Sequence, residues 1–286
     1  MIINKLNPQG YCGGVKKAIE IAYKSISDPN VKKPIYLLGS IIHNQHVIDD
    51  LTSKGAIIIE DKNLSRLELL DRINEGTVIF SAHGVAPSVY TKAIEKGLEI
   101  IDTTCQNVKL IQNKIKSQLE AGYVCIYIGT ANHPECEAIL DINDKIRLIE
   151  TKEDIAKLNI KDNKIFVTNQ TTLSLYDTKL IYEIIKQKYP ISIIDNKICQ
   201  ATTIRQQAVL NQEKVDLCIV IGDEKSSNTK KLLSASKIAG IDAILVSDLE
   251  DLKKHNLANI KSVSVTSGAS TPDYIVDNII EYLKKI

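Results

Sequence analysis

Short apolar runs alternate with helical patterns along the whole chain. The runs IYLL at 35–38 and CIVI at 218–221 contain no charged position, which is typical of strands that are buried on both faces. Between such runs the apolar residues recur at helical spacing, as Val108, Ile111 and Ile115 do. Alternating strands and helices predict parallel sheets covered by helices, so we expect an α/β fold with mainly parallel sheets.

The same pattern occurs three times. The phrase EIIDTTCQ at 99–106 matches SIIDNKICQ at 192–200, and YCGGV takes the same place before the first helix. A repeat of roughly 95 residues is a usual size for a structural unit. We therefore expect three pseudo-equivalent α/β units, over residues 1–97, 98–190 and 191–286, arranged around a common centre.

The composition excludes several classes of protein. Of the 286 residues, 44% are apolar and 25% are charged, and the formal net charge is +1, so neither a disordered tail nor a strongly basic nucleic-acid binder fits. The chain has two Phe and no Trp, which disfavours stacking platforms for single-stranded nucleic acid. The first residues contain no long apolar stretch, so we expect no signal peptide, no membrane span and a cytoplasmic location.

The six cysteines are of two kinds. Cys12, Cys105 and Cys199 lie 93 and 94 residues apart, each at a strand-to-helix turn, which indicates ligands of zinc or of an iron–sulfur cluster. Equivalent strand ends can meet around a pseudo-threefold centre, which would make this the central cluster site. No fourth protein ligand stands out, so one coordination position would stay open for a substrate. We expect the remaining cysteines to be buried core residues: Cys125, Cys136 and Cys218.

Polar side chains gather where the other strands end. Each alone is typically a cap or turn former, but together they offer many hydrogen-bond donors and little bulk, as expected for a small phosphate or diphosphate. No Walker A or Gly-x-Gly-x-x-Gly pattern follows a strand, which disfavours nucleotides. We expect no site role for His46 or His255. The candidates are His43, His83, His133, Glu135, Thr168, Asn169, Thr171, Thr172, Ser226, Ser227, Asn228, Ser270 and Thr271.

Nine short motifs stand in order along the chain: YCGGV at 11, HN at 43, FSAHG at 80, DTTC at 102, HPE at 133, QTTLS at 170, CQATTIRQ at 199, SSN at 226 and SGASTPD at 267. Together they resemble the IspH/LytB family of 4-hydroxy-3-methylbut-2-enyl diphosphate reductases over nearly the whole chain. Two positions depart from the usual family pattern. Gln106 ends a phrase, DTTCQ, that usually reads DATCP, and Cys136 stands where an apolar residue is common.

The resemblance implies a role for each of these residues. Cys12, Cys105 and Cys199 would hold a 4Fe-4S cluster whose fourth iron takes the hydroxyl oxygen of the substrate. Glu135 would donate a proton, with Thr171 and His133 as further catalytic residues. The substrate-binding positions would be His43, His83, His133, Thr171, Ser226, Ser227, Asn228 and Ser270.

The implied reaction removes an allylic hydroxyl with two electrons and two protons, giving isopentenyl and dimethylallyl diphosphate in the last step of the non-mevalonate pathway. The electrons would come from an external donor such as flavodoxin or ferredoxin. Two alternatives stay open, namely a redox-neutral hydro-lyase and a non-catalytic iron–sulfur sensor or electron carrier. A requirement for external electrons would separate the reductase from the hydro-lyase, and a carrier needs no ring of anion-binding loops.

Overall fold

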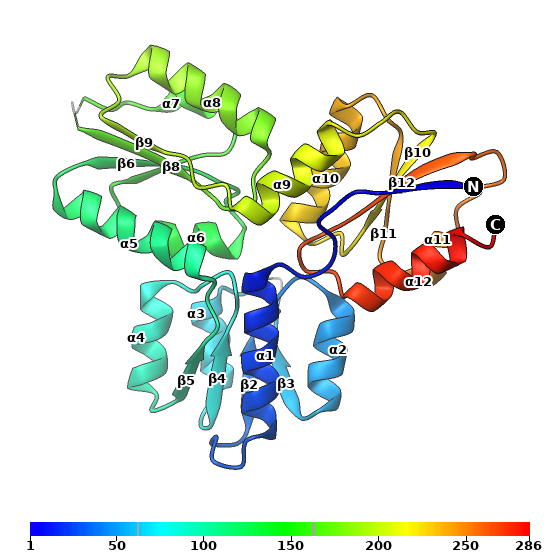
Figure 1. Ribbon diagram of the computed structural model, residues 1–286. Coiled ribbons are helices and arrows are strands. Elements are labelled where there is room, and N and C mark those ends of the chain that lie inside the picture. Colours follow the sequence, from blue (N-terminus) through cyan, green and yellow to red (C-terminus); the bar gives the residue numbers. More distant parts are fainter. Residues whose placement is uncertain (62, 162–163) are drawn as a thin grey trace.

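The protein consists of three α/β lobes that meet at one centre, as Figure 1 shows. The computed structural model describes residues 1–61, 63–161 and 164–286. Each lobe is built on one four-stranded sheet in which all paired strands are parallel, which confirms the expected fold class. Among the described residues, no helix has both the length and the apolar character needed to cross a bilayer.

The first lobe, at the bottom of Figure 1, has the strand order β3-β2-β4-β5. Its apolar strands pair in register, so that Ile35 lies opposite both Ala56 and Thr77. The elements are α1 (Gly13–Ser27), β2 (Ile35–Leu38), α2 (Gln45–Ser53), β3 (Ala56–Ile59), α3 (Arg66–Leu69), the 3-10 turn η1 (Leu70–Arg72), β4 (Thr77–Phe80), α4 (Pro87–Glu95) and β5 (Glu99–Asp102).

The second lobe repeats this arrangement with the strand order β7-β6-β8-β9. Its elements are α5 (Gln106–Glu120), β6 (Val124–Ile128), α6 (Pro134–Leu140), β7 (Ile146–Ile149), α7 (Asp154–Lys157), β8 (Ile165–Asn169), α8 (Leu175–Lys188) and β9 (Ile193–Asp195).

The third lobe has the strand order β1-β12-β10-β11 and therefore joins the two ends of the chain. Its elements are β1 (Ile2–Lys5), α9 (Gln200–Leu210), β10 (Leu217–Ile221), α10 (Ser227–Ile238), β11 (Ala243–Val246), α11 (Leu249–Leu252), β12 (Ser262–Ser267) and α12 (Asp273–Leu283).

The chain crosses between lobes at three equivalent places, and a cysteine stands at each of them. The strand before Cys12 belongs to the third sheet, whereas the helix after it, α1, packs on the first sheet. In the same way, Cys105 separates β5 of the first sheet from α5 on the second, and Cys199 separates β9 of the second sheet from α9 on the third. The crossings therefore carry the three thiols to the place where the lobes meet.

The boundaries of the three sheets do not coincide with the boundaries of the three sequence repeats. β5 opens the repeat 98–190 but pairs with β4 of the repeat before it, and β9 likewise pairs with β8. Each repeat thus contributes its first strand to the sheet of the preceding lobe, because the repeat begins before the crossing and the lobe begins after it. The repeat boundaries at 97/98 and 190/191 stay a prediction from sequence similarity, whereas the lobes are defined by the observed sheets.

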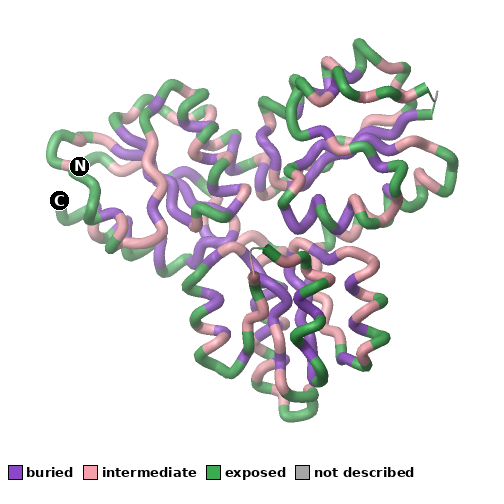
Figure 2. The backbone as a smooth tube through the Cα atoms, turned by 180° about the vertical axis from the view of Figure 1, so that it is seen from behind, coloured by how far each residue is buried: buried purple, intermediate pink, exposed green. Residues whose placement is uncertain are grey.

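An aliphatic core fills each lobe on both faces of its sheet, and the tube of Figure 2 is mostly purple, for buried, through the middle of each lobe and greener along the outer helices. Cys125 and Cys218 are 0% exposed within strands, and Cys136 is 0% exposed on α6, so the expectation that all three are buried is confirmed. Cys12, Cys105 and Cys199 are only partly buried. Burial thus separates the two kinds of cysteine.

Candidate functional site

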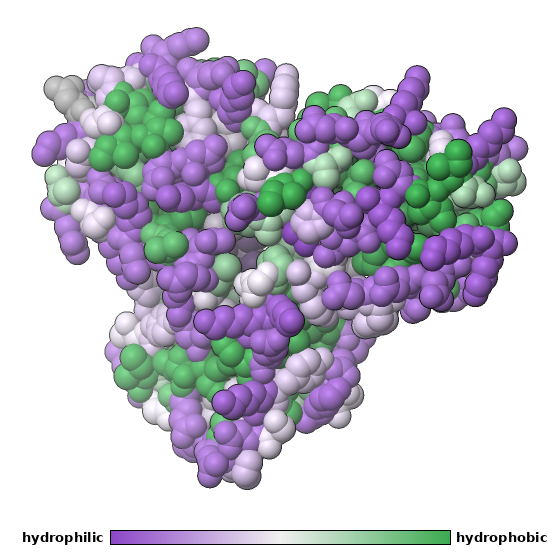
Figure 3. Space-filling view, viewed as in Figure 1, coloured by the Kyte–Doolittle hydropathy of each residue, from purple (hydrophilic) through white to green (hydrophobic). Residues whose placement is uncertain are grey.

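A cavity of about 320 Å³ lies where the lobes meet, and Figure 3 shows the surface hollowed near this point. The structure brings together all the side chains for which the sequence analysis predicts a role in metal binding, substrate binding or catalysis. The ones that line the cavity are Cys12, His43, His83, Cys105, His133, Glu135, Thr171, Cys199, Ser226, Ser227, Asn228 and Ser270. Their placement agrees with the expected convergence, and their roles stay predictions.

Each of the three cysteines is the N-cap residue of a helix: Cys12 of α1, Cys105 of α5 and Cys199 of α9. Its backbone N–H donates to a carbonyl of the lobe that the chain has just left, at 3.0 Å to Ala269, 2.9 Å to Ala82 and 3.0 Å to Thr171 respectively. Free N–H groups and the positive end of the helix dipole favour a negative charge at a helix N-terminus. Three such ends therefore point three thiols at one place.

The thiols are close neighbours. The charges of Cys12 and Cys199 both act on the pKa of Cys105, and a Cβ atom on Gly14 would lie 2.6 Å from Cys105 Sγ. Glycine at position 14 thus leaves room for the sulfur. Burial raises the pKa of Cys105 and of Cys199. Without a metal these two side chains are therefore protonated thiols, and each must lose its proton to bind one. Three soft sulfur donors on helix N-termini fit an iron–sulfur cluster or zinc.

Glu135 is the buried acid of the cavity, with a side chain that is 1% exposed in the first turn of α6. Its Oε1 accepts a hydrogen bond from the Thr171 backbone N–H at 2.9 Å and its Oε2 accepts one from Thr171 Oγ1 at 2.7 Å. Tyr127 donates its hydroxyl to Oε1 at 3.3 Å. Burial raises the pKa of Glu135 to about 7, although these donors favour the charged form. The carboxyl can therefore hold or release a proton near neutral pH.

Three histidines form a second group in the cavity. The rings of His43 and His83 stack with centroids 4.5 Å apart, and His133 lies 5.4 Å from His83 in an edge-on arrangement. Burial lowers the pKa of all three, in the case of His133 to about 3, so the imidazoles are neutral. One nitrogen of each lies within 4.8 Å of the others. Neutral imidazoles at this spacing can donate to an anion or hold a metal ion.

The tautomer of His133 follows from its place as the N-cap of α6. Its Nδ1 accepts a hydrogen bond from the backbone N–H of Glu135 at 3.1 Å. In a neutral imidazole the other nitrogen then carries the proton. Nε2 of His133 is thus a hydrogen-bond donor, which is what an anionic ligand requires.

Small polar residues from the third lobe complete the cavity. Asn228, 4% exposed at the start of α10, has no partner for either side-chain atom in the described part of the chain. Ser227 Oγ donates to the Thr172 carbonyl at 3.1 Å and Ser270 Oγ to the His43 carbonyl at 3.0 Å, so both reach across to another lobe. A buried amide without a partner is unfavourable, and a bound polar ligand would satisfy it.

Other polar candidates from the sequence have structural contacts instead. Thr168 donates to the Asp195 carbonyl at 2.8 Å, and Thr271 to the Ile221 carbonyl at 3.0 Å. Asn169 accepts a hydrogen bond from the Tyr182 hydroxyl at 2.8 Å. These three side chains lie outside the cavity lining, whereas Thr172 lines it. His46 lies 3.3 Å from Asp248 at the surface, as expected of a residue without a site role.

Three side chains near the site were not among the predicted residues. Arg66 is largely buried, and its charge lowers the pKa of each histidine. It pairs with Glu137, 71 residues away, so no local pattern could have indicated it. Tyr127 contacts Glu135 but looks like a core residue in an apolar strand. Arg205 lies in the phrase CQATTIRQ, on the helix that precedes an apolar strand. A charged residue in that position was the signal that could have indicated it.

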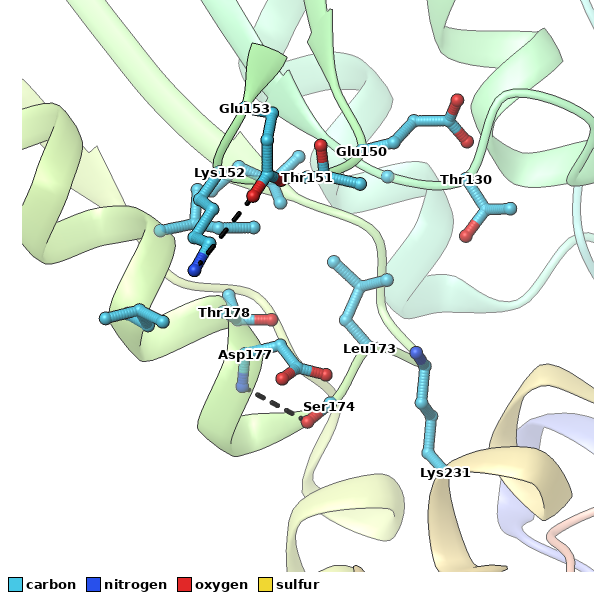
Figure 4. A pocket seen from close by; sticks show the side chains of 14 residues that line it. Thr130, Glu150, Thr151, Lys152, Glu153, Leu173, Ser174, Asp177, Thr178 and Lys231 are labelled. Carbon is cyan, nitrogen blue, oxygen red and sulfur yellow. Dashed lines mark hydrogen bonds and ion pairs between the residues drawn. The ribbon is translucent and has the colours of Figure 1, made fainter. Parts of the chain in front are cut away.

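A second pocket, of about 350 Å³, lies between the second and third lobes (Figure 4). Glu150 and Asp177 line it, and Lys231 reaches in from α10. The backbone N–H of Asp177 donates to Ser174 Oγ at 3.2 Å, which caps α8. None of the residues predicted for metal binding, substrate binding or catalysis lines this pocket.

Comparison with known proteins identifies relatives along the whole chain. The family described as LytB protein matches residues 3–284. A 4-hydroxy-3-methylbut-2-enyl diphosphate reductase of Bacillus subtilis is 44% identical, covering all of this chain and 91% of the relative. A reductase of the same name from Geobacillus thermodenitrificans is 43% identical, with 100% and 90% covered.

Solved structures agree with this. The E-1-hydroxy-2-methyl-but-2-enyl-4-diphosphate reductase from Plasmodium falciparum superposes with a TM-score of 0.91 at 35% identity, over 99% of this chain and 88% of that one. A second structure, of (E)-4-hydroxy-3-methyl-but-2-enyl diphosphate reductase, the terminal enzyme of the non-mevalonate pathway, has a TM-score of 0.69 at 30% identity, with both chains fully covered.

The pKa of Glu135 predicts how stability depends on pH. Between the ordinary value of 4.5 and about 7, the folded chain keeps a proton that the unfolded chain has lost. The free energy of unfolding should therefore fall as pH rises through this window, by up to about 1.4 kcal/mol per pH unit. Glu135→Gln cannot ionise and removes this component. Urea unfolding of both proteins at pH 5 and pH 7.5 checks it, and a stability difference that does not change with pH would contradict it.

Proposed function

The chain belongs to the LytB protein family, and from this we propose that it reduces 4-hydroxy-3-methylbut-2-enyl diphosphate to isopentenyl and dimethylallyl diphosphate. In this reaction the allylic C–O bond breaks, and two electrons and one proton remain on the allyl fragment. A second proton converts the departing hydroxide into water. The reducing cytoplasm, where free thiols persist, is the compartment that suits this chemistry.

One observation carries the proposal. A single cavity joins three thiols on helix N-termini, a buried acid with a pKa of about 7, and a group of neutral donors suited to an anion. A hydro-lyase could use the same groups and would differ in consuming no external electrons, but the relatives of this chain are reductases. An electron carrier would have no use for the unpartnered amide of Asn228 or for the group of histidines.

Cys12, Cys105 and Cys199 would hold a 4Fe-4S cluster. Their thiols are close enough to act on one another electrostatically, and each lies at the positive end of a helix, where a thiolate is favoured. When bound, the cluster would supply electrons and Lewis acidity for the loss of the hydroxyl. The electrons come from an external donor, for which a flavodoxin or a ferredoxin is our proposal.

The diphosphate would bind among the histidines and the polar residues of the third lobe. His133 offers Nε2–H, and Asn228 offers an amide that has no partner within the described chain. Three imidazoles could also hold a metal ion, but a metal on the imidazoles would leave the buried amide of Asn228 without a partner. Hydroxyl and amide donors around neutral imidazoles favour phosphate oxygens.

Glu135 would deliver the proton to the departing hydroxide. The two hydrogen bonds from Thr171 fix both carboxyl oxygens, and the Thr171 carbonyl in turn accepts the N–H of Cys199. The acid is thereby held at a set place relative to a metal ligand. A pKa near the working pH is what general acid catalysis requires.

Removal of one thiol should abolish the cluster. Cys105→Ala leaves two sulfur ligands, which hold a cubane poorly, so iron and sulfide bound after anaerobic reconstitution should fall to a small fraction of the wild-type content. Cys218→Ala is the matched control, because Cys218 is buried in a strand and should leave the content unchanged. A full cluster in Cys105→Ala would refute the ligand assignment.

Loss of an anion donor should weaken substrate binding. Hydrogen bonds to charged groups are worth about 1.5 to 3 kcal/mol, so Asn228→Ala and Ser270→Ala should each raise the Kd of the substrate roughly 10- to 100-fold. Isothermal titration on reconstituted protein measures this. Asn256→Ala serves as the control, because Asn256 is exposed and does not line the cavity. Unchanged affinity in both variants would reject the diphosphate site.

The proposed acid is tested by Glu135→Gln, which keeps the shape and removes the proton. Turnover with a chemical reductant should fall about 100- to 10,000-fold, the usual range for a general acid. Cluster content and substrate affinity should persist, since Glu135 is neither a metal ligand nor a diphosphate donor in this proposal. A near-normal rate would leave Glu135 with only a structural role, namely its hydrogen bonds with Thr171 and Tyr127.

A further inference from the structure

Arg205 is a buried cation that the proposed reaction does not use. It lies on α9, six residues after Cys199, and its side chain is 2% exposed. Nη1 donates to the Ala201 carbonyl at 3.1 Å and Nη2 to the Gly10 carbonyl at 2.7 Å. The guanidinium therefore bridges the segment before Cys12 and the first turn after Cys199.

This cation has no ion-pair partner. Within the described ranges no carboxylate lies within 4.0 Å of its nitrogens, and Nε has no hydrogen-bond acceptor there. Asp273, whose charge does act on the pKa of Arg205, is exposed. Arg66, the other largely buried arginine near the cavity, by contrast pairs with Glu137 at 2.9 Å. An isolated buried charge is strongly unfavourable, so a counter-charge is to be expected close to Arg205.

The metal ligands can supply that charge. Burial lowers the pKa of Arg205, and negative charge on Cys12 and Cys199 acts in the opposite direction, ahead of Asp273. Cysteines that bind metal are thiolates, so the counter-charge is present when the site is filled. Guanidinium keeps its proton at any physiological pH. The charge of Arg205 is thus balanced by the filled site and not by a neighbouring acid.

We propose that the buried positive charge of Arg205, beside Cys12 and Cys199, balances the negative charge of the filled site and thereby raises the reduction potential of the cluster. This rests on the proposed function. A reduced cluster carries one more negative charge than an oxidised one, so a fixed cation nearby favours the reduced form. Solvent does not screen the charge, because the side chain is 2% exposed.

The test compares three variants after reconstitution. Arg205→Gln removes the charge, Arg205→Lys keeps it, and Lys197→Gln removes an equal charge from a side chain that is 43% exposed and paired with Asp195. Iron content is measured first, and a redox titration followed by electron paramagnetic resonance without substrate then gives the midpoint. At a fixed potential, Arg205→Gln should lower the ratio of reduced to oxidised cluster about tenfold, which is 59 mV for one electron. The other two variants should stay near the wild-type ratio.

An unchanged midpoint in Arg205→Gln overturns the proposal. Loss of the cluster in both Arg205 variants also overturns it, because the forked hydrogen bonds to Gly10 and Ala201 would then be the requirement. Loss in Arg205→Gln with retention in Arg205→Lys supports the need for charge. A wild-type chain that assembles no 4Fe-4S cluster refutes the proposed function itself, before any variant is compared, and this inference with it.

Discussion

The site depends on one constraint of the backbone, namely that the chain passes from lobe to lobe at the carboxyl ends of three strands. Each passage ends a strand in one sheet and begins a helix on the next, and the residue in between is a helix N-cap. Parallel sheets present their ligands at such strand ends, where helix N–H groups are free. The fold thus places Cys12, Cys105 and Cys199 together without any contact having to be added for that purpose.

Burial determines the protonation states around this centre. Desolvation disfavours charge, so it leaves Glu135 with a pKa of about 7 and the three histidines neutral. The same cavity therefore contains an acid that can give a proton and imidazoles that can donate without carrying charge. Two arginines keep their charge beside the cavity, namely the buried Arg205 near the thiols and the largely buried Arg66 near the histidines.

Much of this was predictable from the sequence, because the three repeats mark equivalent positions. Equal spacing singled out the cysteines, and the HPE phrase singled out Glu135. The exchange of strands between lobes was not predictable, since β5 has the same apolar pattern whichever sheet it joins. Tyr127 looked like a core residue, and Arg66 depends on Glu137, 71 residues away in the sequence. Contacts of this kind depend on packing between lobes, which a local pattern does not contain.

The joining of both chain ends in the third sheet has a consequence for biosynthesis. Ile2 pairs with Ser262 and Lys5 with Val265, so β1 has no strand to join until nearly the whole chain has left the ribosome. The segment before Cys12 is likewise held by Val265, through Gln9. The first two lobes can form during translation, whereas Cys12 reaches its final position only when β12 is present. A cluster held by Cys12, Cys105 and Cys199 would therefore be loaded into the released protein, and a chain truncated before β12 would lack not only a strand but also the correct position of Cys12.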